Sequence, residues 1–72
     1  MGKAKVKIIL NGKEEILLRP MTVRELVSLK GWNPDKIVVE LNREIVGKGA
    51  WADLSLKEND KMEILSFVGG GN

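Results

Sequence analysis

Apolar and polar residues alternate in two short runs near the beginning of the chain. A strong turn signal, Asn11-Gly12, separates the two runs. Alternation with a period of two is typical of β-strands that bury one face, so the runs predict a β-hairpin. The residues that we expect on the buried face are Val6, Ile8, Leu10, Ile16 and Leu18.

The length of the hairpin loop decides which side chains share a face. A two-residue loop, Asn11-Gly12, would set Ile8 opposite Glu15 and mix apolar and charged side chains. A three-residue loop that includes Lys13 sets Ile8 opposite Ile16. Because a shift of one residue would turn the whole apolar set to water, we expect the three-residue loop. Its weak point is Lys13, at a position that often requires glycine.

A short helix is predicted after the hairpin. Thr22 and Glu25 have the spacing of a capping box, in which each side chain bonds to the other residue's backbone N–H. Gly31 suits the position that ends a helix, and Pro34 prevents its resumption. We therefore expect a helix over Val23–Lys30. Met21, before the helix, and Leu26, in its first turn, are expected to pack against each other as a hydrophobic staple. The residues expected to face the core are Val23, Leu26, Val27 and Leu29.

The remainder of the chain predicts three further strands. They cover Ile37–Leu41, Glu44–Val46 and residues 61–67, with a helical turn near residues 49–53. Met62 and Ile64 are expected to face inward. The order β-β-α-β-β-β predicts an α+β fold in which one short helix packs on a mixed, mainly antiparallel sheet. If the first and last strands lie in the middle of that sheet, the glycine tail leaves from a rigid central strand.

Composition limits the chemistry that the chain can perform. The 72 residues suffice for one domain, and the net charge of +2 is too small to indicate a nucleic acid partner. The absence of Cys and His removes thiolate catalysis, imidazole chemistry and zinc ligation by these residues. No apolar run is long enough to span a bilayer and no signal peptide is apparent, so we expect a soluble cytoplasmic monomer.

The chain ends in Gly69-Gly70-Gly71-Asn72, directly after the last predicted strand. Glycines without side chains gain nothing by packing, so one interpretation is an ordinary flexible end. The other is a chain thin enough to thread a narrow channel, whose terminal carboxylate is the reactive group. On either interpretation, residues 1–68 form the domain and residues 69–72 a flexible tail.

Two apolar residues next to this tail are candidate partner-docking residues. Leu65 and Phe67 alternate with Met62 and Ile64 and therefore face the other side of the sheet. They form either a small exposed docking patch or a second, minor core beneath the loop around Trp51. We expect Trp51 itself to pack the loop against the main core.

Four segments of the chain resemble the ThiS-type sulfur carriers of thiazole formation in thiamine biosynthesis, within the ThiS/MoaD ubiquitin-like family. Their order and spacing, followed by terminal glycines, resemble this family over essentially the whole chain. The resemblance implies the β-grasp, or ubiquitin-like, fold. The segments are residues 11–14 (Asn-Gly-Lys-Glu), residues 22–26 (Thr-Val-Arg-Glu-Leu), residues 41–46 (Leu-Asn-Arg-Glu-Ile-Val) followed by Lys48 and Trp51, and residues 60–70.

The resemblance implies that the chain is a co-substrate and not an enzyme. A ThiF-like adenylyltransferase would use ATP and magnesium to activate the C-terminal glycine, and the chain itself would bind no cofactor. Sulfur from a cysteine desulfurase or sulfurtransferase would then give a thiocarboxylate, which thiazole synthase consumes. In this reading Gly70 and Gly71 carry the sulfur, and Val68 and Gly69 position the tail. No metal site and no membrane partner are implied.

The chain departs from the family pattern at three places. Arg43 stands where the family often has Gly, and Gly47-Lys48 stand where it often has Pro-Arg. Asn72 follows the glycine that would be activated, so we expect Gly71 to be the working end once Asn72 is removed. The alternatives are a small-subunit-type carrier of molybdopterin synthase, a ubiquitin-like modifier, and a β-grasp binding module whose tail has no chemical role.

Overall fold

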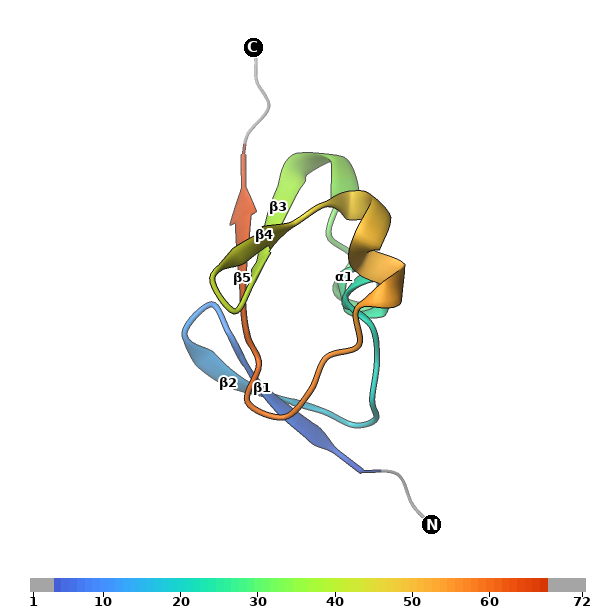
Figure 1. The fold of residues 1–72 in the computed structure, drawn as a ribbon, viewed down its shortest axis with the longest axis vertical. Coiled ribbons are helices and arrows are strands. Elements are labelled where there is room, and N and C mark those ends of the chain that lie inside the picture. Colours follow the sequence, from blue (N-terminus) through green and yellow to red (C-terminus); the bar gives the residue numbers. More distant parts are fainter. Residues whose placement is uncertain (1–3, 68–72) are drawn as a thin grey trace.

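A computed structural model describes residues 4–67 of the chain. The single α-helix among these residues packs on one face of a five-stranded sheet, which confirms the α+β fold predicted from the sequence (Figure 1). Two short 3₁₀ helices, η1 and η2, flank the third and fourth strands. The elements are β1 (Val6–Leu10), β2 (Lys13–Leu17), α1 (Val23–Lys30), η1 (Pro34–Lys36), β3 (Ile37–Leu41), β4 (Glu44–Val46), η2 (Lys48–Asp53) and β5 (Lys61–Ser66).

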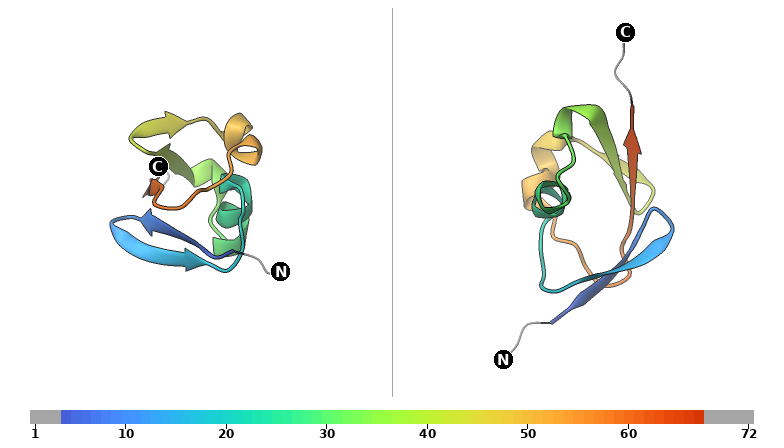
Figure 2. Two further views of the ribbon diagram at one scale, coloured as in Figure 1. Left: turned by 60° about the horizontal axis from the view of Figure 1, so that its bottom comes forward. Right: turned by 180° about the vertical axis from the view of Figure 1, so that it is seen from behind.

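The last strand lies in the centre of the sheet. The strand order is β2-β1-β5-β3-β4, in which β1 and β5 are parallel and all other neighbours are antiparallel. The first and last strands therefore lie beside each other in the middle of the sheet, which is the condition under which the tail leaves from a central strand. Figure 2 shows β5 running between the two hairpins, with α1 on one side of the sheet only. The chain thus leaves the sheet from a strand with a neighbour on each side.

Two asparagine side chains complete the hydrogen bonding of β5, one from each neighbouring hairpin turn. On the β1 side, the Asn11 N–H donates to Met62 O, and the Ile64 N–H donates to Asn11 Oδ1 at 2.8 Å. On the β3 side, the Asn42 N–H donates to Lys61 O, and the Lys61 N–H donates to Asn42 Oδ1 at 3.0 Å. In a regular ladder the acceptor in each case would be the asparagine's own carbonyl oxygen. The amide side chain therefore replaces that carbonyl where the backbone turns away.

Both asparagines adopt the left-handed conformation, with φ of 51°. Asparagine tolerates this region better than most residues because its short polar side chain can hydrogen-bond locally. Each of them therefore forms a turn and supplies an acceptor to β5 at the same time. Few other residue types combine these two properties.

The hairpin register differs from the prediction. The loop has two residues, and Ile8 pairs with Glu15 rather than with Ile16. Asn11 and Gly12 both have positive φ, as a two-residue type I′ turn requires, so Lys13 need not adopt the conformation that disfavours it.

The shorter loop exchanges the faces of β2. Leu17 is 2% exposed and belongs to the core, whereas Ile16 is 52% exposed, and Leu18 also lies at the surface. The carboxylate of Glu15 is tolerated on the inner face because β2 is an edge strand of the sheet. Its Oε2 is 2.6 Å from Nζ of Lys30, which lies in the last turn of α1.

The helix has the predicted bounds and the predicted caps. The Glu25 N–H donates to Thr22 Oγ1, and the Thr22 N–H donates to the Glu25 carboxylate, which completes the capping box. Gly31 is left-handed with φ of 74° and ends the helix. The prediction that Leu29 faces the core is wrong, because its side chain is 69% exposed. The short helix η1, which begins at Pro34, was not predicted from the sequence.

The core lies between α1 and the inner face of the sheet. Trp51 joins it from η2 and is buried, as predicted, with its indole N–H donating to Val46 O at 3.1 Å. Full burial of one Val, Leu, Ile or Met side chain in this core stabilises the fold by about 1.5–3 kcal/mol. The buried residues are Val6, Ile8, Leu10, Leu17, Met21, Val23, Leu26, Val27, Ile37, Val39, Trp51, Leu56 and Met62.

Replacement of Asn11 by glycine tests the role of its side chain in the sheet. Glycine keeps the left-handed turn but removes the acceptor for the Ile64 N–H, so we expect a loss of about 1 kcal/mol in the free energy of unfolding. Asn59→Gly is the matched control, since Asn59 also has positive φ, at 70°, but its side chain makes no hydrogen bond within residues 4–67. Urea denaturation measures both variants. Equal stability of the two would show that the Asn11 side chain contributes nothing beyond its backbone conformation.

Candidate functional site

The end of β5 carries the two described residues that the sequence analysis assigned to the site. The strand is held there by β3, since the Phe67 N–H donates to Lys36 O at 3.0 Å just after the last paired residue, Ser66. Leu65 is paired directly with Val38 of β3. Backbone pairing therefore fixes the direction of the chain up to the last described residue.

Leu65 and Phe67 are exposed on the face of the sheet that α1 does not cover. Their exposed fractions are 54% and 51%, whereas Met62, which points to the other face, is fully buried. The alternative of a second core beneath the Trp51 loop is therefore wrong, because Trp51 packs into the main core on the helix side. The two residues lie at the surface, as a docking patch requires.

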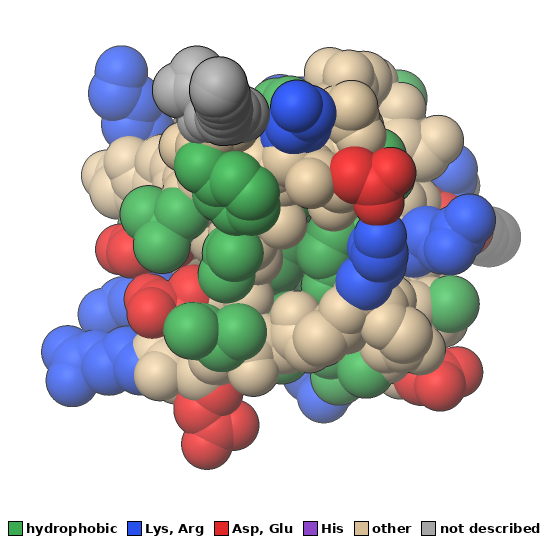
Figure 3. All heavy atoms as spheres, turned by 90° about the horizontal axis from the view of Figure 1, so that it is seen from above, with side chains coloured by type: hydrophobic (Ala, Val, Ile, Leu, Met, Phe, Trp, Pro, Cys, Tyr) green, Lys and Arg blue, Asp and Glu red, His purple; other side chains and the backbone are tan. Residues whose placement is uncertain are grey.

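Two further apolar residues extend this surface. Val38 is the cross-strand partner of Leu65, and Ile45 of β4 is paired with Glu40, two residues further along β3 on the same face. We call these four residues, Val38, Ile45, Leu65 and Phe67, the exposed sheet patch. Figure 3 looks down on the end of the molecule at which β5 ends and shows hydrophobic side chains gathered along one side. Contiguous exposed apolar surface of this kind is typical of sites that bind other proteins.

Acidic side chains border the exposed sheet patch. Glu40 of β3 and Glu63 of β5 lie directly opposite each other on this face. Like charges in a directly opposed pair repel each other, so a basic group of a partner would relieve this repulsion. The patch therefore combines apolar area with a preference for positive charge.

An ion pair joins η1 to η2 near the same end of the molecule. The Lys48 ammonium donates a hydrogen bond to the Asp35 carboxylate. This hydrogen bond, together with the charge of Lys48, lowers the pKa of Asp35 below its usual value. Both side chains are exposed, so water screens their attraction and the pair adds little to stability.

The remaining predicted site residues, Val68, Gly69, Gly70 and Gly71, lie outside the described residues. Within residues 4–67, no group of three or more Asp, Glu, His or Cys side chains is arranged to hold a metal ion. Over the same residues, no helix has the length and apolar character needed to cross a membrane.

Val38 and Ile45 were not predicted from the sequence to belong to this surface. Alternation within Ile37–Leu41 places Val38 on the face opposite Ile37 and Val39, and this signal was available in the sequence. The sequence does not reveal that β3 pairs with β5, because 19 residues separate the end of β3 at Leu41 from the start of β5 at Lys61. This pairing sets Val38 beside Leu65.

Comparison with known proteins identifies the family. The ThiS family model matches residues 4–71. The sulfur carrier protein ThiS of Bacillus subtilis is 35% identical over 63 residues, which is 86% of this chain and 96% of that protein. A crystal structure of a thiamine biosynthesis protein (ThiS) from Geobacter metallireducens superposes with a TM-score of 0.78 at 33% identity, covering 92% of this chain and all of that one.

Longer relatives contain a segment similar to this chain. A thiazole synthase of Paramagnetospirillum magneticum is 39% identical over 67 residues, and one of Magnetococcus marinus is 35% identical over 66 residues. The match covers 93% and 92% of this chain, but the chain spans only about a fifth of the length of these proteins, 21% and 20% respectively. With the family match over residues 4–71 and the β-grasp structure of its relatives, the chain belongs to the ThiS family.

Proposed function

We propose that this protein is a sulfur carrier of thiamine biosynthesis whose C-terminal glycine is adenylated and then converted to a thiocarboxylate. The observation that supports the proposal most strongly is the combination of family membership with a glycine terminus that follows the central strand β5. The B. subtilis relative named as a sulfur carrier protein supports the same role. The protein is then a co-substrate of other enzymes rather than a catalyst.

The proposed chemistry starts from the low reactivity of a carboxylate. Its negative charge repels nucleophiles, and oxide is not a usable leaving group. Attack of the carboxylate oxygen on the α-phosphorus of ATP, with loss of pyrophosphate, gives an acyl-adenylate whose leaving group is AMP. A persulfide sulfur from a cysteine desulfurase or sulfurtransferase then displaces AMP. Reduction of the remaining S–S bond by a thiol leaves the thiocarboxylate.

The activation step belongs to a partner enzyme. We assign it to a ThiF-like adenylyltransferase, in which magnesium would neutralise the ATP phosphates. The chain contributes Gly71 as the reacting residue and Gly70 as its neighbour, after removal of Asn72. Val68 and Gly69 position the tail. Glycine suits these positions because a side chain would obstruct a narrow channel leading to the adenylation site.

The exposed sheet patch fits the docking role. Leu65 lies on β5 and Phe67 directly after its last residue, so a partner that covers them is close to the reacting end. Thiazole synthase is the proposed acceptor of the sulfur. This assignment is supported by the thiazole synthases that contain a segment similar to this chain, since fusion into one polypeptide is common for proteins that act together.

The intact mass of the untagged protein from its native cell tests the proposal. We expect loss of Asn72 and a gain of about 16 Da from replacement of one oxygen by sulfur at the terminus. Incubation with ATP, magnesium and a ThiF-like enzyme without a sulfur source should instead give the adenylate. An unchanged mass after both treatments would contradict the proposal and favour a β-grasp binding module.

Substitution of Gly70 by valine tests the role of the tail. We expect Gly70→Val to fold normally but to lose adenylation, because the branched side chain blocks the channel of the activating enzyme. Gly47→Val is the matched control, since Gly47 has negative φ and a Cβ at this position meets nothing within 4 Å. Adenylation by a ThiF-like enzyme, followed by mass spectrometry, compares the two. Normal adenylation of Gly70→Val would show that the tail does not enter a narrow channel.

Substitution of Leu65 by serine tests the exposed sheet patch. Leu65 is half exposed, so we expect its replacement to change the free energy of unfolding by no more than about 1 kcal/mol. We expect kcat/KM for adenylation to fall about tenfold through KM, as for an interface anchor. Leu29→Ser, an exposed leucine on α1, is the control and should leave kcat/KM unchanged. Equal effects of the two substitutions would exclude a specific docking role for Leu65.

A further inference from the structure

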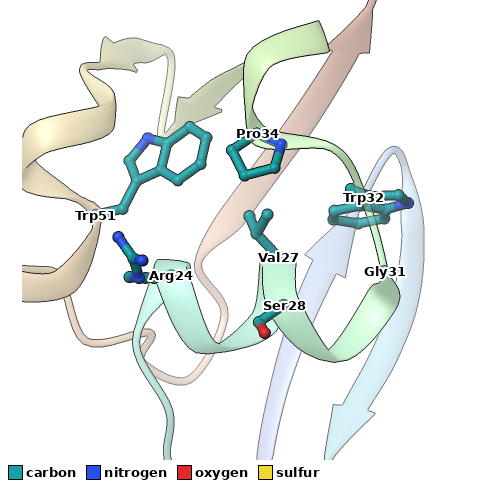
Figure 4. A pocket seen from close by; sticks show the side chains of 7 residues that line it. All are labelled: Arg24, Val27, Ser28, Gly31, Trp32, Pro34 and Trp51. Atoms are coloured by element: carbon teal, nitrogen blue, oxygen red, sulfur yellow. The ribbon is translucent and has the colours of Figure 1, made fainter.

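A second surface feature lies on the helix side of the molecule. It is a cleft of about 240 Å³ between α1, η1 and η2. Figure 4 shows Trp51 and Trp32 at its two sides, Pro34 and Val27 between them, and Arg24 reaching from α1 toward Trp51. The cleft and the exposed sheet patch therefore lie on opposite faces of the sheet.

The walls of the cleft are fixed by the fold. Trp51 is buried, with its indole N–H bonded to Val46 O, so only part of its ring lines the cleft. The Trp32 N–H donates to Val27 O at 3.2 Å, in the turn where Gly31 ends the helix. Pro34, in the first turn of η1, is restricted by its own ring. The Trp51 and Pro34 walls and the backbone at Trp32 are thus fixed before binding, which lowers the entropy cost of binding.

Arg24 gives the cleft a positive charge. Its side chain is exposed, and within residues 4–67 it takes part in none of the four ion pairs, whose cations are Lys7, Arg19, Lys30 and Lys48. Ser28, one helical turn further along α1, adds a hydroxyl group to the same wall. A guanidinium beside an aromatic wall is suited to a carboxylate that follows an apolar group.

We propose that this cleft binds a segment of a partner protein that presents one large apolar side chain next to an acidic residue. The volume is below the range of about 300–1,000 Å³ typical of small-molecule sites but exceeds the cavity of about 150 Å³ that holds benzene, so it suits a single phenylalanine- or leucine-sized side chain. Tryptophan and arginine are the residues most enriched at energetically important interface positions. Arg24 selects the acidic neighbour by charge.

A partner bound in this cleft leaves Leu65, Phe67 and β5 uncovered, because these lie across the sheet. The protein is then able to remain attached to one protein through the helix side while a second contacts the exposed sheet patch. This second surface is independent of the chemistry at the C-terminus, so the two proposals fail or succeed separately.

Binding of short peptides to the ¹⁵N-labelled full chain tests the inference. The probe is the blocked peptide acetyl-Gly-Glu-Phe-Glu-Gly-amide, compared with versions in which both Glu are Gln or the Phe is Ala. We expect saturable shifts of the Trp32 and Trp51 indole N–H signals and of the Val27 amide. The Gln peptide should bind about three- to tenfold more weakly, and the Ala peptide should not saturate.

Two variants distinguish the cleft from general attraction between charges. Arg24→Gln should abolish the preference for the Glu peptide over the Gln peptide, whereas Arg43→Gln, on the β3–β4 turn, should retain it. Amide signal dispersion confirms that both variants are folded. The inference is overturned by equal binding of the Glu and Gln peptides, by shifts at Leu65 and Phe67 instead of the tryptophans, or by no saturation up to about 10 mM, beyond the millimolar range.

Discussion

The fold depends on the placement of β5 between β1 and β3, each of which turns away at an asparagine beside residues 61–64, in the first half of β5. Without further acceptors, the N–H groups of Lys61 and Ile64 would lose their ladder partners at those turns. The side chains of Asn42 and Asn11 supply the missing oxygen atoms, at 3.0 and 2.8 Å. The first half of β5 is thereby held from both sides and its end is held by β3, so the direction of the chain is fixed as far as Phe67. The proposed carrier role needs such a fixed origin if the terminus is to reach an active site in a defined direction.

Local signals in the sequence were sufficient for the helix, but not for the hairpin. The Thr22–Glu25 box and Gly31 act within one or two turns of the chain, so their outcome does not depend on the rest of the fold. The hairpin register depended on a comparison between turn chemistry and side-chain burial. Burial alone favours the three-residue loop, but the Asn11-Gly12 turn decides the register, because Lys30 of the helix neutralises the inward-facing Glu15. That ion pair joins residues 15 positions apart and has no signature in either segment alone.

The same distinction between local and distant information applies to the site. Alternation along residues 61–67 correctly placed Leu65 and Phe67 on the face away from the core. Their exposure was undecided in the sequence, because it depends on whether another segment covers that face. In the structure η2 packs with α1 on the opposite face, through Trp51. The position of this one tryptophan therefore leaves Leu65 and Phe67 exposed, and it also forms one wall of the helix-side cleft.

A carrier of this kind meets a constraint that an enzyme does not. In the proposed function its terminus enters the active sites of two different proteins in turn, so the first partner must dissociate from any surface next to the terminus before the second can bind. Strong binding at the exposed sheet patch would slow that exchange, because dissociation rates account for most differences in affinity among related complexes. A second contact on the opposite face avoids this conflict, since it adds affinity without covering β5 and raises the effective concentration of the terminus. The absence of Arg24 from the ion pairs within residues 4–67, beside a preformed aromatic wall, is consistent with such a contact.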